Sequence, residues 1–210
     1  YATMTEIEKD PRVREKYPAL MDAASDVGSL QIRNNGIIGG NIGNASPAGD
    51  LLPVLYLYDA KIEIMGPEGI RMAGIDEVLA GPGRMTLAYN EAITRILLPP
   101  CSYTTSFVKL GSRKKVTISR IGVALGVEME KDHVKDIRLY IGAVSVKPLH
   151  LTAAEDFIRG KVLNELNILD MAQILSDYVK ENVAVEFDRD YKVYAAKGAV
   201  MDAFLRLKRD

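Results

Sequence analysis

The chain has 210 residues, of which 48% are hydrophobic and 26% are charged. This composition is typical of a globular protein with enough chain for one large domain or two small ones. The formal net charge of -1, from 27 basic and 28 acidic residues, leaves no broad basic field, which argues against nucleic acid or an anionic membrane as a main partner. No apolar run reaches the roughly 20 residues that a membrane-spanning helix needs.

The residue types that usually carry chemistry are scarce. Cys101 is the single cysteine, which excludes an internal disulfide and a metal cluster built from several cysteines of this chain. A single cysteine fits a reducing compartment, and we expect a cytoplasmic location. The two histidines, His133 and His150, are far apart in the sequence, and no nucleophile–base pair stands out. The sequence therefore predicts neither catalytic side chains nor metal ligands.

The first third of the chain is predicted to be helical and then rich in glycine. Residues 5–8 (TEIE) match a capping box that starts a helix. Asp10 before Pro11 is a second helix start, because proline is favoured at the first helical position. Pro18 opens a further helix, and Gly28 is expected to stop it.

Residues 36–50 (GIIGGNIGNASPAGD) are predicted to form a loop that holds a ligand. Gly39, Gly40 and Asn41 would expose consecutive backbone N–H groups, and such a nest suits a phosphate. Small polar side chains add hydrogen-bonding groups without net charge: Asn41, Asn44 and Ser46. Asp50 could accept hydrogen bonds from a ribityl or ribose hydroxyl. The alternative is a tight connection without a ligand, because glycine motifs are weak signals when taken singly.

Alternation of apolar and polar residues predicts strands after this stretch. A hairpin is expected through Pro67, Glu68 and Gly69, and a strand over residues 92–98. Pro99 and Pro100 cannot continue a ladder, and we place a domain boundary there, which divides the chain into residues 1–99 and 100–210.

The second part is predicted to be a small sheet followed by about three helices. Three strand-like runs lie between residues 103 and 146, and the second and third form a hairpin with Lys131 and Asp132 at its tip. From Thr152 the period changes to that of a helix, and residues 152–155 (TAAE) match a second capping box.

These residues resemble a known family. The stretch QIRNNGIIGGNIGNASPAGD is similar to the second flavin-binding segment of the medium, FAD-binding subunits of molybdenum hydroxylases, among them the carbon monoxide dehydrogenase flavoprotein and the FAD domain of xanthine dehydrogenase. The family pattern is RNxGTIGGNIxxASPAGD, and the chain matches it at Arg33, Asn34, Gly36 and residues 38–42 and 45–50. The segments LAGPGRMTLAYNEAITRILLP and SFVKLGSRKKVTISRIGVAL continue the resemblance over nearly the whole chain.

The resemblance implies an α+β fold with two parts. The first is the distal half of a PCMH-type FAD-binding domain. The second is a C-terminal domain like that of the carbon monoxide dehydrogenase flavoprotein, with a three-stranded antiparallel sheet and a helical bundle. By resemblance, Ile93 lies on a strand that covers the isoalloxazine ring and Lys109 lies near the flavin. The full set of residues implied to bind FAD is Ile37, Ile38, Gly39, Gly40, Asn41, Asn44, Ser46, Asp50, Ile93 and Lys109.

The resemblance also implies a function: the chain would be an electron-transferring subunit of an oxidoreductase. Electrons would pass from a molybdopterin-binding large subunit through two-iron iron–sulfur clusters of a small subunit to FAD in this chain. FAD would then reduce an external acceptor such as NAD, a quinone or oxygen, and the assembly would be a heterotrimer. FAD is the one cofactor expected in this chain. Two alternatives stay open: a structural subunit that has lost its flavin, and an unrelated FAD-dependent oxidase of the same fold.

Two departures from the family pattern bear on the flavin. The family carries an earlier AGGT-type loop that also contacts the FAD diphosphate, and it has no counterpart in this chain, so we expect the chain to be part of a longer subunit. The family's threonine before Ile38 is Ile37 here, which removes one hydroxyl from the expected phosphate site.

Overall fold

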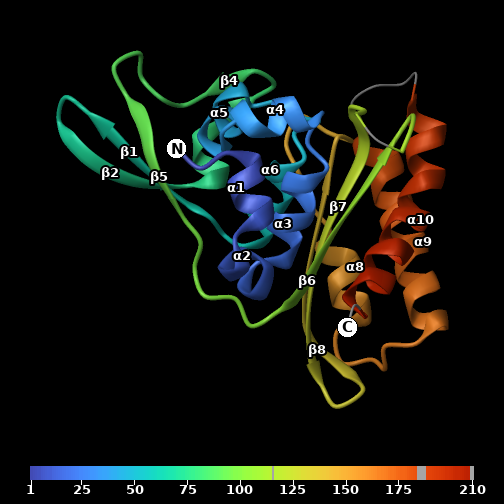
Figure 1. Cartoon of the computed structure of the whole chain (residues 1–210). Coiled ribbons are helices and arrows are strands. Elements are labelled where there is room, and N and C mark those ends of the chain that lie inside the picture. The colour runs from blue at the N-terminus through green and yellow to red at the C-terminus, as the bar shows by residue number, and fades with distance from the viewer. Residues whose placement is uncertain (115, 184–187, 209–210) are drawn as a thin grey trace.

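A four-stranded antiparallel sheet separates two layers of helices in the computed structural model of the chain (Figure 1). The structure describes residues 1–114, 116–183 and 188–208. The strand order is β6-β7-β8-β9, with bounds β6 (Thr104–Gly111), β7 (Ser119–Glu130), β8 (His133–Gly142) and β9 (Leu149–His150). The three long strands confirm the predicted antiparallel sheet, to which β9 adds a two-residue edge strand.

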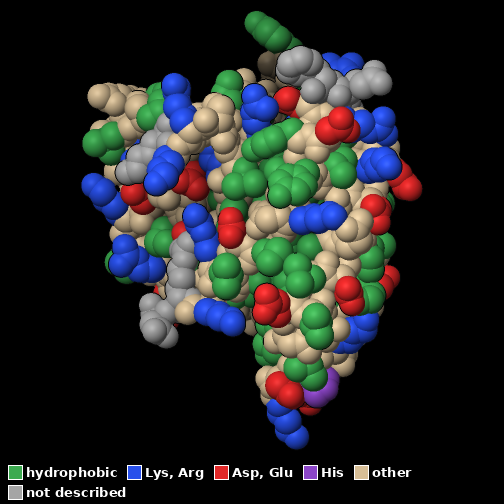
Figure 2. All heavy atoms as spheres, turned by 90° about the vertical axis from the view of Figure 1, so that its right-hand side faces the viewer, with side chains coloured by type: hydrophobic (Ala, Val, Ile, Leu, Met, Phe, Trp, Pro, Cys, Tyr) green, Lys and Arg blue, Asp and Glu red, His purple; other side chains and the backbone are tan. Residues whose placement is uncertain are grey.

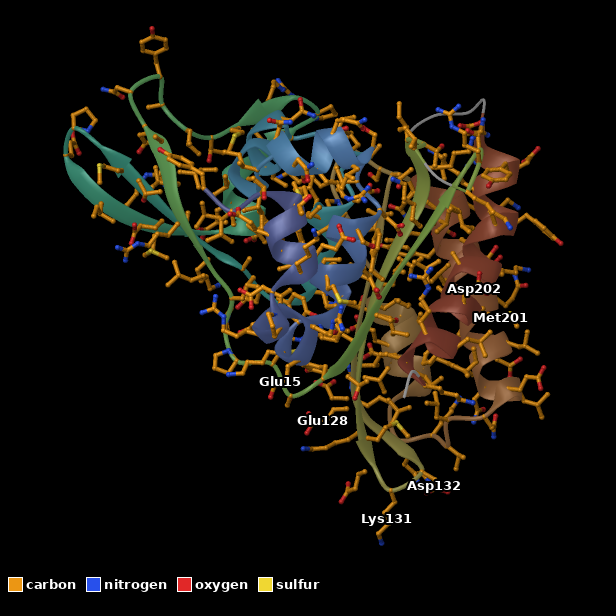
Figure 3. All side chains as sticks on the ribbon, viewed as in Figure 1. Glu15, Glu128, Lys131, Asp132, Met201 and Asp202 are labelled. Carbon is orange, nitrogen blue, oxygen red and sulfur yellow. The ribbon has the colours of Figure 1, made fainter. Side chains whose placement is uncertain are left out.

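The hairpin between β7 and β8 turns at the predicted residues. Glu130 pairs with His133, so Lys131 and Asp132 form the turn, with Lys131 at a φ of 58°. In Figure 3 these two residues lie at the end of a hairpin that extends beyond the rest of the chain.

Six short helices precede the first strand: α1 (Met4–Lys9), α2 (Pro11–Lys16), α3 (Pro18–Ser25), α4 (Leu30–Asn35), α5 (Ile38–Asn44) and α6 (Leu51–Leu57). Asp10 caps α2 as predicted. The capping box of α1, however, is formed by Thr3 and Glu6 and not by residues 5–8. A β-bridge between Thr3 and Ile37 holds Thr3 in the extended conformation that an N-cap requires, which explains the shift of two residues.

A second antiparallel sheet has the order β2-β1-β5, with bounds β1 (Lys61–Gly66), β2 (Gly69–Gly74) and β5 (Ala92–Leu97). It confirms the hairpin and the strand predicted between residues 60 and 98. Short elements connect β2 to β5: α7 (Ile75–Val78), β3 (Leu79–Gly81) and β4 (Arg84–Met85).

The C-terminal helices are α8 (Thr152–Ile158), α9 (Glu165–Asn182) and α10 (Arg189–Leu207). The capping box predicted at residues 152–155 is wrong, because Leu151 is the N-cap and makes no side-chain cap. Thr152 is instead the first helical residue. Glu155 is turned inward, where it accepts a hydrogen bond from the Leu139 backbone N–H at 2.6 Å and pairs with His150 at 2.9 Å.

The two faces of the main sheet carry separate cores. Phe107 and Ala124 join the core formed with α3 and α6, whereas Val108, Val123 and Leu125 pack with α8, α9 and α10. The exposed side of α9 and α10 shows hydrophobic side chains interspersed with charged ones (Figure 2). The most exposed of these apolar side chains are Leu166, Tyr194 and Leu205.

Glycines in the sheet bring α6 close to the strands. A Cβ added to Gly142 would lie 3.1 Å from Pro53 Cγ, and one added to Gly126 would lie 3.1 Å from Leu57 Cδ1. Both distances are tighter than ordinary van der Waals contact. The segment before α6 also contacts the sheet directly, because Asp50 bonds to Lys109 of β6 and to Ser119 of β7.

Candidate functional site

Seven of the fifteen residues of the glycine-rich stretch form a helix and not the predicted loop. Residues 38–44 form α5, which begins after Ile37 and ends at Ala45 in the left-handed conformation, with a φ of 44°. Ile42 is completely buried and anchors the helix to the first core. Packing of this side chain overrides the poor helix propensity of Gly39, Gly40 and Gly43.

The start of α5 still presents the backbone N–H groups that the predicted phosphate site requires. The amides of Gly39 and Gly40 lie in the first turn, where a helix offers no internal acceptor. Ile37 is the N-cap and makes no side-chain cap, while the Ile38 N–H is used by a hydrogen bond to the Ala2 carbonyl at 3.1 Å. A Cβ added to Gly39 would meet no atom within 4 Å, so there is free space above this turn.

Five predicted residues line one groove of about 780 Å³, which we call the central groove: Asn41, Asn44, Ser46, Asp50 and Lys109. It lies between residues of the segment 27–50 on one side and Lys109, residues 112–113, residues 116–120 and the start of α10 on the other. The Oδ1 atom of Asn41 is buried and has no hydrogen-bond partner among the described residues. A buried acceptor without a partner needs an explanation, and a ligand in the groove that donates the missing hydrogen bond would supply it.

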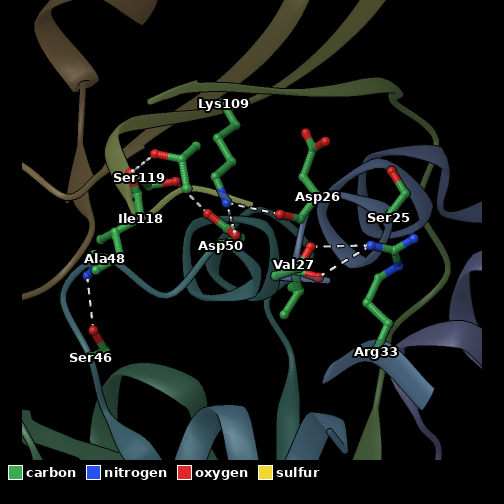
Figure 4. A network of polar contacts seen from close by, with 12 residues as sticks. Ser25, Asp26, Val27, Arg33, Ser46, Ala48, Asp50, Lys109, Ile118 and Ser119 are labelled. Carbon is green, nitrogen blue, oxygen red and sulfur yellow. Dashed lines mark hydrogen bonds and ion pairs between the residues drawn. The ribbon is translucent and has the colours of Figure 1, made fainter. Parts of the chain in front are cut away.

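Lys109 and Asp50, which both line this groove, form a buried ion pair (Figure 4). Lys109 Nζ lies 2.6 Å from Asp50 Oδ2 and donates to the Asp26 carbonyl at 2.8 Å, and each of the two side chains is 7% exposed. The Ser119 hydroxyl donates to the other carboxylate oxygen of Asp50. Burial raises the pKa of Asp50, while the Lys109 ammonium group and the Ser119 hydroxyl act in the opposite direction.

The remaining predicted residues face elsewhere. Ile37, Ile38, Gly39 and Ile93 line a second groove of about 420 Å³, here called the β5 groove. Gly40 is exposed in the first turn of α5. The structure thus divides nine of the ten predicted residues between two grooves and leaves Gly40 in neither. Successive residues of a helix point in different directions, whereas a loop could present them all to one ligand.

Sequence reasoning missed two residues that shape the central groove, Ser119 and Lys192. Lys192, on α10, donates to the Ala143 carbonyl at 2.7 Å, and the Ala143 N–H donates to the Pro47 carbonyl at 2.9 Å. This chain of contacts ties α10 to the segment before α6. Burial lowers the pKa of Lys192. Ser119 lies within the family-like segment at residues 106–125 and Lys192 lies in no recognised motif, and for both the contact with the groove appears only in the folded chain.

The described residues contain neither a metal-binding cluster nor a membrane-spanning helix. No group of three or more His, Cys, Asp or Glu side chains within residues 1–114, 116–183 and 188–208 is placed to hold a metal ion. Across the same residues, no helix has both the length and the apolar character needed to cross a membrane.

Two family descriptions match the chain in succession. Residues 1–101 match the "FAD binding domain in molybdopterin dehydrogenase", and residues 106–207 match the "CO dehydrogenase flavoprotein C-terminal domain". The nicotinate dehydrogenase FAD-subunit of Eubacterium barkeri is 31% identical over 210 residues, which cover 97% of this chain and 71% of that protein. The xanthine dehydrogenase FAD-binding subunit of Escherichia coli is 30% identical over 185 residues, or 87% of this chain.

Solved structures share the fold. Carbon monoxide dehydrogenase from Hydrogenophaga pseudoflava superposes with a TM-score of 0.85 at 26% identity, over 97% of this chain and 71% of that one. Quinoline 2-oxidoreductase from Pseudomonas putida 86 superposes with a TM-score of 0.89 at 22% identity, over 98% and 72%. The chain spans 62% of the length of the Escherichia coli relative.

Proposed function

The chain belongs to the FAD-binding subunits of molybdopterin dehydrogenases, and we propose that it binds FAD and transfers electrons within such an oxidoreductase. In this proposal iron–sulfur clusters of a small subunit reduce FAD, which then passes electrons to an external acceptor. The observation that carries the proposal is the start of α5, where the Gly39 and Gly40 amides have no internal acceptor and a Cβ added to Gly39 would meet no atom within 4 Å. A helix N-terminus of this kind attracts the negative charge of a diphosphate.

The described residues fit part of an FAD molecule. The Gly39 and Gly40 amides would hold the diphosphate. The unpartnered Oδ1 of Asn41 would accept a hydrogen bond from a hydroxyl group of the cofactor. Ile93 in the β5 groove would cover part of the isoalloxazine ring. Asn44 and Ser46 would contribute further hydrogen bonds from the central groove. FAD itself supplies the redox chemistry, so the chain needs to bind and orient it and not to add acid–base groups.

Lys109 would place one fixed positive charge beside the flavin. Its ammonium group is held by Asp50 and by the Asp26 carbonyl, so it cannot swing away into solvent. We propose that Asp50 acts mainly by positioning Lys109, because donors already occupy both of its carboxylate oxygens. Its predicted contact with a ribityl hydroxyl stays a prediction.

The partners follow from the same family. We propose a complex with a molybdopterin-binding large subunit and an iron–sulfur small subunit, located in the cytoplasm, with NAD, a quinone or oxygen as the acceptor. We also propose that a domain boundary lies between residues 99 and 100. The first family match ends at residue 101 and the second begins at residue 106, which supports that placement.

The visible absorbance of the complete natural protein tests the proposal against the flavin-less alternative. We expect flavin bands and about one FAD per polypeptide after gel filtration. A protein that folds and joins its partner subunits but carries no flavin would make the chain a structural subunit. An FAD protein that never associates with molybdenum and iron subunits would support the unrelated oxidase instead.

A further inference from the structure

Lys192, on α10, is a buried lysine that lines the central groove. It is 8% exposed, and its Nζ donates to the Ala143 carbonyl at 2.7 Å. Among the described residues, no carboxylate lies within 4 Å of this ammonium group. Burial lowers the pKa of Lys192, because a charge inside a protein is costly when no opposite charge compensates it. The groove therefore presents a positive charge that lacks an anion.

The other charged side chains of the central groove are either paired or exposed. The ion pairs are Lys109 with Asp50, at 2.6 Å, and Arg120 with Asp188, at 3.3 Å. Arg113 has no ion pair with another described residue, but it is exposed, so water and salt screen its charge. Within the described part of the chain, Lys192 is thus the one cation of this groove that is both buried and unpaired.

The hydrogen-bond acceptor of Lys192 is itself fixed. Ala143 has a φ of 65°, in the left-handed region, and its N–H donates to the Pro47 carbonyl at 2.9 Å. The residues on both sides of Pro47, Ser46 and Ala48, line the central groove as well. Lys192 is therefore held beside the segment before α6, and its charge is oriented in advance of any ligand.

We propose that Lys192 compensates the negative charge of the reduced flavin ring. This step rests on the proposed function, in which FAD lies in the central groove and receives electrons from iron–sulfur clusters. Two electrons and one proton convert the neutral oxidised ring into a singly charged anion, while the charge of the diphosphate stays the same. A fixed cation beside the ring therefore stabilises the reduced form more than the oxidised form and raises the midpoint potential. Lys109 has the weaker effect, because the charge of Asp50 offsets its own.

The experiment measures the affinity for oxidised FAD and the midpoint potential of bound FAD in the complete protein and its Lys192→Met variant. Methionine is a flexible side chain without charge. We expect the affinity for oxidised FAD to change by less than about threefold and the affinity for reduced FAD to fall about tenfold. A tenfold loss for the reduced form alone lowers the two-electron midpoint potential by about 30 mV. Lys192→Arg keeps the charge and should keep the potential close to that of the wild type.

The matched control is Lys197→Met, which removes a lysine of the same helix that bonds to Gln173 and lies outside the central groove. This variant should keep the wild-type potential. If Lys192→Met does not fold, Lys192→Gln takes its place, because glutamine keeps an N–H donor without the charge.

An unchanged potential in the variant without the Lys192 charge overturns the proposal. Equal weakening of oxidised and reduced FAD also overturns it, because the charge then acts on the diphosphate. The same decrease in Lys192→Arg or in Lys197→Met does so too, since the cause is then structural and not the charge at this position. Flavin content of the wild type is measured first. A folded wild type without flavin overturns the proposed function, whereas flavin that binds with a potential insensitive to Lys192 overturns this inference alone.

Discussion

Lys109 and Asp50 join β6, an edge strand of the main sheet, to the N-cap of α6 through a buried ion pair with 2.6 Å between Nζ and Oδ2. They are 59 residues apart in the sequence, and each is held by a further partner, the Asp26 carbonyl for Lys109 and the Ser119 hydroxyl for Asp50. The pair therefore connects the two halves of the chain at the groove where we propose that the flavin binds.

Removing one member of this pair should destabilise the protein more than removing both charges. Lys109→Met leaves the Asp50 carboxylate buried without its cation, and we expect a loss of about 3–5 kcal/mol in the free energy of unfolding. Lys109→Met combined with Asp50→Asn should lose less than Lys109→Met alone. Urea denaturation of the wild type, both single variants and the double variant measures this coupling. Additive losses would show that the two side chains do not stabilise each other.

The close packing of α6 on the sheet leads to a second prediction. Gly126→Val places carbon atoms where Leu57 and the Tyr103 side chain already lie, and we expect a destabilisation of about 1–3 kcal/mol. Gly198→Ala is the control, because its added Cβ meets no atom within 4 Å on an exposed face of α10. That change should stabilise the helix by about 0.5–1 kcal/mol. Equal thermal midpoints for Gly126→Val and wild type would contradict the packing described above.

Glu91 should make the stability of the β2-β1-β5 sheet depend on pH in the acid range. Two hydrogen bonds from Arg71 and one from the Ala88 N–H hold the pKa of Glu91 down at about 2, against 4.5 for the free side chain. Because the folded pKa is the lower one, this contribution to stability is complete above about pH 4.5 and is lost as the pH falls through about 2. Glu91→Gln should therefore be less stable than wild type at neutral pH, and the difference should shrink in acid. Urea midpoints measured from pH 6 to pH 2 check this, and a difference that stays constant would contradict it.

Strands and their connections could be predicted from the sequence because alternation and turn residues are local signals. The hairpin at Lys131 and Asp132 is an example, since the two flanking runs alternate and the turn residues lie between them. The helix α5 could not be predicted in this way. Its glycines disfavour a helix locally, and what favours it is the burial of Ile42 and the bridge between Thr3 and Ile37, both of which depend on distant parts of the chain.

The residues of the candidate site stay a prediction, and their arrangement differs from the one that the sequence indicates. A loop was expected to bring residues 37–50 to one ligand, whereas α5 directs Ile37, Ile38 and Gly39 to the β5 groove and Asn41 and Asn44 to the central groove. The positions of Ser119 and Lys192 follow from the fold alone, because each reaches the groove from a different element of the second half.

The affinity of the complete protein for FAD, measured for Gly40→Val and Gly43→Val, tests the central claim most directly. Both glycines are exposed residues of α5, but Gly40 lies in the first turn and Gly43 near the end, where an added Cβ would lie 3.7 Å from Met85 Sδ. Gly40→Val should obstruct the diphosphate, and the loss of two charge-assisted contacts at about 1.5–3 kcal/mol each would weaken binding by roughly two to four orders of magnitude. Gly43→Val should leave affinity near that of the wild type. If Gly40→Val binds FAD as tightly as wild type does, the start of α5 does not hold the diphosphate and the proposed site is wrong.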